Sequence, residues 1–198
     1  MRKLALVLAL SVVSAVAAGL PDAERRVLTD HLSKSSQEFL ASVAGLTPEQ
    51  WNFKAGPDRW SIAQCAEHIA LAEDFLRGMI ESKVLTAEPT PDKIAERKPL
   101  DDKVLQMIVD RSFKAQAPEP VQPSSKFGSP QASVEHFKES RARTAALAES
   151  RDDLRERATE HPVFKDLDAY QWLLFLSGHT LRHTAQIQEV KASPGFPK

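Results

Sequence analysis

Cysteine is nearly missing from this sequence, since Cys65 is the single one among 198 residues. An intramolecular disulfide is therefore excluded, and the fold must be stabilised by its apolar core. Charge of one sign is lacking too, because 26 basic residues stand against 27 acidic ones without a long run of either. That balance argues against nucleic acid as a partner.

Patterns typical of other fold and enzyme classes are absent as well. No segment alternates apolar and polar residues over the length of a strand, so we expect an all-α fold. The sequence contains no His-Glu-x-x-His, no Gly-x-Ser-x-Gly and no phosphate-binding glycine loop. It therefore lacks the signatures of the common zinc proteases, serine hydrolases and nucleotide-binding enzymes.

Long apolar runs are scarce, and the longest one lies at the N-terminus. Arg2-Lys3 is followed by a short apolar stretch and by Ala15-Val16-Ala17. This order predicts a secretory signal peptide over residues 1–18, cleaved after Ala17. We expect an exported protein, periplasmic or secreted, with residues 19–198 as one domain and no membrane span after cleavage. The alternative is an uncleaved membrane anchor.

The sequence does contain helical periodicity. Apolar residues recur at spacings of three and four in four segments, which are 22–43, 62 to about 84, 130 to about 157, and 170–190. This pattern predicts a four-helix bundle. Residues 86–130 hold seven of the thirteen prolines and predict a long connection between the second and third helices. One amphipathic helix is expected within it, carried by Leu100, Val104, Met107, Ile108 and, as a further candidate, Phe113.

Histidines stand out on the predicted inner faces. His179 and His183 are one helical turn apart, so both rings can converge on one point beside the fourth helix. His68 lies in the apolar stripe of the second helix, which also contains Cys65, Leu71, Ala72, Phe75 and Met79. Facing helices of a bundle commonly supply metal ligands, and three imidazoles would leave a fourth coordination position open. The alternative is that these are half-buried structural histidines.

The other histidines fit simpler roles. We interpret His31 as structural, His136 as exposed, and His161 as a loop residue that could rim the site. The third helix is expected to bury Val134, Phe137, Thr144, Leu147 and Leu154.

Three further side chains flank the predicted site residues. Cys65 is interpreted as apolar packing at the start of the second helix rather than as a ligand. Gln186 is either a hydrogen-bond partner of a ligand or a polar residue at the bundle edge. Glu67 points about 100° away from His68 around the helix and is not interpreted as a catalytic base.

Taken together, these residues resemble the DinB-like (DinB/YfiT) superfamily of metalloenzymes over about residues 24–190. The resemblance is carried by Trp60-Ser61-Ile62, His68-Ile69, His161-Pro162, Trp172 and His179-x3-His183-x2-Gln186-Ile187. It implies a four-helix bundle with up-up-down-down connectivity. It also implies a divalent metal, nickel or zinc foremost and manganese or iron as alternatives, on His68, His179 and His183.

The same resemblance guides the expected function. Relatives include thiol transferases and mycothiol-dependent isomerases, which work in the cytoplasm, whereas this chain carries a predicted export signal. We therefore expect an exported metalloprotein with an open coordination position, acting as a hydrolase or transferase on an unidentified small molecule. The alternative is a non-catalytic bundle that binds a metal or another ligand. A homodimer is left open beside a monomer.

Overall fold

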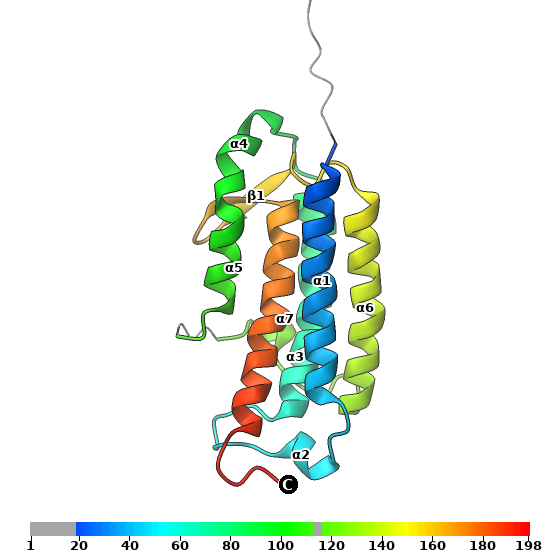
Figure 1. The fold of residues 1–198 in the computed structure, drawn as a ribbon, viewed down its shortest axis with the longest axis vertical. Helices are drawn as coiled ribbons and strands as arrows, with labels where there is room; N and C mark the ends of the chain where they lie inside the picture. The colour runs from blue at the N-terminus through cyan, green and yellow to red at the C-terminus, as the bar shows by residue number, and fades with distance from the viewer. Residues whose placement is uncertain (1–18, 113–115) are drawn as a thin grey trace, which may run out of the picture.

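Four long helices packed side by side form the body of the molecule (Figure 1). The structure is a computed structural model that describes residues 19–112 and 116–198. The four helices are α1 (Asp22–Val43), α3 (Ile62–Met79), α6 (Pro130–Ser150) and α7 (Ala169–Lys191). The predicted all-α four-helix bundle is therefore confirmed. The predicted signal peptide and Phe113 lie outside the described residues. Within the described ranges, no helix combines the length and the apolar character needed to cross a membrane.

Shorter elements connect the four helices. They are α2 (Pro48–Asn52), a π-helical turn (Ile80–Val84), α4 (Ile94–Arg97), α5 (Asp101–Val109), three 3-10 turns (Pro91–Lys93, Lys98–Leu100 and Glu119–Val121), β1 (Ala158–His161) and β2 (Lys165–Asp168). Helix α5 is the amphipathic helix expected in the long connection, and it packs against α7. Gly178 permits this close approach, because a Cβ there would lie 2.3 Å from Cγ2 of Ile108.

The helix directions correct one expectation. Helix α1 runs parallel to α7, since the Tyr170 hydroxyl near the start of α7 donates to the Glu24 carbonyl near the start of α1. Helices α3 and α6 run the opposite way, so the order along the chain is up-down-down-up rather than up-up-down-down (Figure 1). An up-up-down-down bundle requires two long crossover connections. This chain has one, between α3 and α6, and its other two connections simply reverse the chain.

Hydrogen-bonded caps fix where the helices begin. At α3, the Ser61 hydroxyl accepts from the backbone N–H of Gln64, while the Gln64 side chain accepts from the backbone N–H of Ser61. Asp168 and Gln171 form the same reciprocal pair at the start of α7. Each pair satisfies two amides that the helix itself leaves unbonded. The caps therefore set the register in which the histidines of α3 and α7 face each other.

The two largest apolar clusters of the core lie along the bundle, with a charged pair between them. One cluster contains Leu28, Leu32 and Ile80, and the other centres on the edge-to-face pair Phe39 and Phe137. The Arg141 guanidinium donates to both carboxylate oxygens of Glu73 at 2.7 and 2.8 Å. It also donates to Ser35 of α1 and Thr180 of α7. Because these bonds satisfy the buried charges, the pair joins all four helices without an unpaired ion.

Two expectations about the segment between α6 and α7 were wrong. Helix α6 ends at Ser150 rather than near Arg157, and the irregular stretch around His161 is the antiparallel hairpin of β1 and β2. Arg155 explains the early helix end, because its buried guanidinium reaches Glu24, Asp101 and Asp168 from a non-helical segment. Leu154 is buried as predicted, although it lies outside the helix.

One side chain of α3 also differs from its predicted position. Phe75 was expected inside the bundle, yet it is 46% exposed. Its neighbours Leu71 and Ala72 are buried against Val121 of the long connection rather than in the bundle core. The loop around Val121 thus covers Leu71 and Ala72 on this face of α3 but leaves Phe75 partly exposed.

Candidate metal centre

Three histidines from two helices converge on one point. Nε2 of His68 on α3 lies 3.2 Å from Nε2 of His179 and 3.1 Å from Nε2 of His183, both on α7. One ligand-type nitrogen from each ring falls within 4.8 Å of the others. In the described part of the chain, this is the group of histidine, cysteine and acidic residues whose geometry fits a shared ion. The structure therefore brings together the three residues that the sequence singled out.

Two of the rings are oriented by partners behind them. Nδ1 of His68 lies 2.7 Å from the carbonyl oxygen of Val121, and Nδ1 of His183 lies 2.9 Å from Oε1 of Gln186. Both partners are acceptors, so each Nδ1 carries the proton and each Nε2 presents a lone pair to the centre. Such partners fix the tautomer and orientation of metal-ligating histidines. Of the two roles considered for Gln186, the structure supports the hydrogen bond, which Gln186 makes to His183.

The convergence fits a metal ion better than it fits direct contacts between rings. With Nδ1 protonated on both neutral rings, the 3.1 Å approach of His68 and His183 places two lone pairs face to face without a proton between them. A shared cation would remove that repulsion. Three neutral imidazole nitrogens are a donor set that suits a divalent transition metal, and His68, His179 and His183 would hold such an ion.

Burial keeps the rings in the neutral form that binds metals. The side chains of His68 and His183 are buried, whereas His179 is partly exposed. Burial lowers the pKa of His68, and burial together with the neighbouring His68 lowers the pKa of His183 to about 3. Burial and the two adjacent imidazoles lower the pKa of His179 well below its usual value. Near neutral pH, all three rings therefore offer lone pairs rather than positive charge.

An indole covers one side of the cluster. The Trp60 ring lies 4.9 Å from the His68 ring and 6.2 Å from the His183 ring, measured between centroids. Trp60 also lines a cavity of about 220 Å³, together with Gln116, Ala117, Gln122 and Pro123. The partly exposed His179 marks the accessible side.

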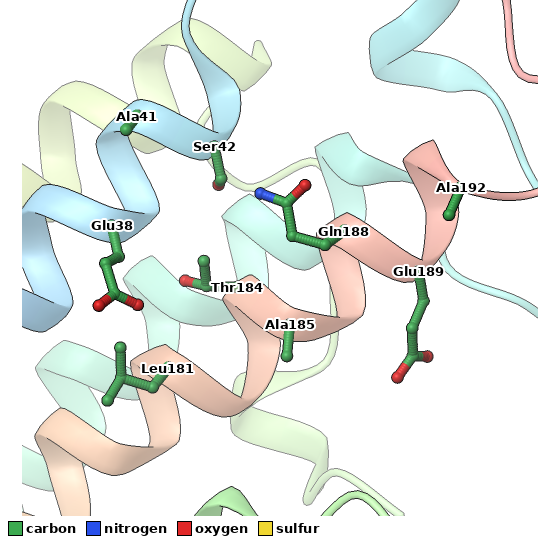
Figure 2. A pocket seen from close by; sticks show the side chains of 9 residues that line it. All are labelled: Glu38, Ala41, Ser42, Leu181, Thr184, Ala185, Gln188, Glu189 and Ala192. Carbon is green, nitrogen blue, oxygen red and sulfur yellow. The ribbon is translucent and has the colours of Figure 1, made fainter.

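A larger groove lies elsewhere on the molecule. Figure 2 shows it between the parallel helices α1 and α7. It is lined by Glu38, Ala41, Ser42, Leu181, Thr184, Ala185, Gln188, Glu189 and Ala192. Its lining contains no imidazole or thiol, so we assign the chemistry to the three-histidine cluster rather than to the larger hollow.

The structure places the other candidate residues outside the cluster. Cys65 is fully buried among Ile62, Ile69 and other apolar side chains, and this burial raises the pKa of its thiol to about 12. His31 is a half-buried residue of α1. Both positions agree with the structural roles predicted for them.

Two histidines occupy unexpected surroundings. His136 was expected to be exposed, but it is half-buried, with its ring stacked on Phe127 and Nε2 2.5 Å from Asp74. His161 was expected in a loop, but it ends strand β1 and is buried against Trp172 and Phe175. In both cases a ring from outside the residue's own helix or strand covers the imidazole, and the periodicity within one element cannot indicate such a partner.

Sequence reasoning missed the Val121 carbonyl that orients His68. A backbone oxygen is supplied by every residue type, so no side-chain pattern could have marked this position. The proline-rich character of its segment indicated a connection and nothing more specific.

Comparison with known proteins agrees with this arrangement. A family model described as the DinB superfamily matches residues 31–187, a span that contains all three histidines. The chain belongs to the DinB superfamily. It is 30% identical over 150 residues to the uncharacterized protein YuaE of Bacillus subtilis (strain 168). The aligned residues cover 75% of this chain and 88% of YuaE.

A solved structure shares the DinB-superfamily fold seen here. YfiT from Bacillus subtilis matches with a TM-score of 0.54 at 16% identity, over 90% of this chain and 91% of the YfiT chain. YfiT is described as a probable metal-dependent hydrolase with an unusual four-helix bundle topology. At this level of identity the likeness establishes the common fold.

Proposed function

We propose that this protein is a metal-dependent hydrolase that holds a divalent ion on His68, His179 and His183. One observation carries the proposal: three neutral, buried or half-buried imidazoles converge. Nε2 of His68 lies 3.2 Å from Nε2 of His179 and 3.1 Å from Nε2 of His183. The three-histidine donor set suits zinc and nickel, with manganese and iron as alternatives. Bound there, the ion would supply a polarised water or hydroxide in its open position.

The residues of the chain would prepare the site for that chemistry. The Val121 carbonyl and the Gln186 amide oxygen hold Nδ1–H of His68 and His183, which keeps both Nε2 atoms directed at the centre. Trp60 excludes water from the side that it covers. A small substrate would approach at His179, the partly exposed ligand.

Hydrolysis is favoured over thiol transfer for two reasons. The structurally similar YfiT is described as a probable metal-dependent hydrolase. Hydrolysis also needs only water as its second reactant, which is present in any compartment, whereas a thiol transferase needs a thiol of cytoplasmic origin. Since the N-terminal residues predict export, water is the simpler cosubstrate.

Metal binding by histidine variants tests the proposal. Untagged protein is stripped with chelator, reloaded in turn with zinc, nickel, manganese or iron(II), and measured by calorimetry and by thermal unfolding with and without chelator. Wild type should bind one ion, and chelator should lower its Tm, because an ion that binds only the folded state stabilises it by about 4 kcal/mol at a thousandfold excess over Kd. His68→Ala, His179→Ala and His183→Ala should each lose tight binding and the chelator shift.

His136→Ala is the matched control, since it removes an imidazole that contacts Asp74 outside the cluster. It should bind metal as wild type does. Wild type that binds no ion with any of the four metals would contradict the metal site. An ion that binds with no metal-dependent cleavage across ester, amide and phosphoester substrates would favour the alternative, a non-catalytic binding protein.

A further inference from the structure

Glu67 is a buried carboxylate whose partners all belong to one loop. It is 6% exposed, and its oxygens accept hydrogen bonds from three consecutive backbone amides at 2.6–3.2 Å. The donors are Ser124, Ser125 and Lys126. A buried carboxylate is costly without partners, and these three charge-assisted bonds satisfy it.

The loop bends around this carboxylate. Ser125 has φ of +62°, in the left-handed region that residues with a Cβ adopt at a cost of roughly 1–2 kcal/mol. Successive amides in such a turn form a concave arrangement that accommodates an anion. The three bonds to Glu67 therefore offset the unfavourable conformation of Ser125.

The loop held by Glu67 also carries the carbonyl that orients His68. Val121 precedes the three amides by only a few residues, and its carbonyl oxygen lies 2.7 Å from Nδ1 of His68. Glu67 and His68 are neighbours on α3, about 100° apart around the helix. They therefore reach the two parts of one loop, with His68 at Val121 and Glu67 at residues 124–126.

We infer that Glu67 is a positioning residue of the metal centre: by fixing the loop over residues 121–126, it keeps the Val121 carbonyl on Nδ1 of His68 and so directs Nε2 at the ion. This inference rests on the proposed metal site. The Val121 side chain contributes as well, since it is buried against Leu71 and Ala72. An apolar contact has no preferred direction, whereas the three directional hydrogen bonds fix the orientation of the loop.

The variant Glu67→Gln tests the inference. A carboxylate has two acceptor oxygens, whereas an amide has one acceptor oxygen and an NH2 group, which would face the N–H donors of the loop. Three quantities are compared with wild type: the Kd for zinc and for nickel, the amide hydrogen exchange of residues 121–126, and the ¹⁵N NMR tautomer of His68 in metal-free protein. We expect Kd to rise about 10- to 100-fold, as for other partners that orient ligands. Loop exchange should accelerate, and the Nδ1–H tautomer should lose its predominance.

Cys65→Ala is the matched control on the same helix, since the buried Cys65 packs in the apolar core. It should leave the Kd, the loop exchange and the tautomer unchanged. If Glu67→Gln does not fold, Lys126→Pro replaces it, because it removes the donor of the 2.6 Å bond from the loop and leaves the four helices intact.

The outcomes separate this inference from the proposed function. A wild-type tautomer and a wild-type Kd in folded Glu67→Gln would overturn the positioning role, whether or not loop exchange accelerates. The tautomer is measured without metal, so it decides the role of Glu67 even if wild type binds no ion. Absent binding in wild type would overturn the metal site instead.

Discussion

The Cys65 thiol lies one helical turn before His68 but is buried in the apolar core. Its relative exposure is 0%, and burial raises its pKa to about 12. A thiol in this state is neither a nucleophile nor a ready metal ligand, since both roles require the thiolate. At residue scale, the neighbouring positions 65, 67 and 68 thus have three distinct surroundings: Cys65 lies in the apolar core, Glu67 accepts from the loop amides, and His68 lies in the three-histidine cluster.

We predict that Cys65 is unreactive in the native protein. A thiol-specific disulfide reagent at mildly alkaline pH should label no cysteine in native protein and one per chain in guanidinium. Cys65→Ala should lower the free energy of unfolding by about 1 kcal/mol through lost contacts and leave the metal stoichiometry unchanged. Rapid labelling of the native state would contradict the burial of Cys65, and loss of the ion in the variant would show that Cys65 belongs to the centre.

The sequence predicted the positions of histidines correctly where their place on the inner face of a helix was enough to identify them. His179 and His183 share a face because they are one turn apart, and His68 lies in an apolar stripe, so their convergence followed from helix geometry. The roles of Glu67 and Val121 depend on a contact between α3 and a loop that lies more than fifty residues after Glu67 and His68 in the chain. Local periodicity carries no information on that pairing. The same limit explains the wrong exposure predicted for His136, which is covered by Phe127.

At the scale of elements, α7 is the helix that the site depends on most. It carries two of the three histidines, begins at a capping box and is packed by α5 at Gly178. Since Gly178 directly precedes His179, any outward shift of α5 or α7 there is transmitted to the centre.

We predict that Gly178→Ala is destabilising despite the higher helix propensity of alanine. Its Cβ would lie 2.3 Å from Cγ2 of Ile108, so α5 must move, at a cost of about 1–3 kcal/mol in the free energy of unfolding. Urea denaturation measures this change. Adding Ile108→Ala removes the clashing group and should lessen the penalty attributable to Gly178→Ala.

Gly78→Ala is the matched control, because Gly78 is a helical glycine of α3 whose added Cβ would meet nothing within 4 Å. It should stabilise the protein by about 1 kcal/mol through helix propensity alone. A Gly178→Ala variant as stable as Gly78→Ala would show that α5 does not pack closely on α7.

The predicted starts of α3 and α7, at residues 62 and 170, lie within one residue of the observed Ile62 and Ala169, whereas the hairpin was not predictable. Its strands have four residues each, and the first, Ala-Thr-Glu-His, has no apolar alternation. The buried Arg155 that ends α6 early is likewise stabilised by acidic partners from distant segments.

At the scale of the whole molecule, the number of long connections decides the helix directions. One long crossover between α3 and α6 gives up-down-down-up, and the sequence shows that crossover as a proline-rich stretch. The directions were therefore within reach of the sequence, although the family resemblance suggested otherwise.

We propose that the mature protein acts outside the cytoplasm, on the basis of the N-terminal sequence, which lies outside the described residues. Protein recovered from its natural host should begin at or near Ala18 in N-terminal sequencing. Ala17→Phe should retain residues 1–17, because cleavage requires a small residue at that position. An intact Met1 on a cytoplasmic pool of wild type would contradict export.

The ligand set has a mechanical consequence. His68 and His179 lie 111 residues apart in sequence, on antiparallel neighbouring helices. An ion held by both would tie two distant points of the chain together, much as a disulfide does in proteins that have the cysteines to form one. Unlike a disulfide, this tie forms without oxidation and is released by a chelator. The centre would then be a reversible cross-link between α3 and α7, and removal of the ion should speed unfolding and proteolysis.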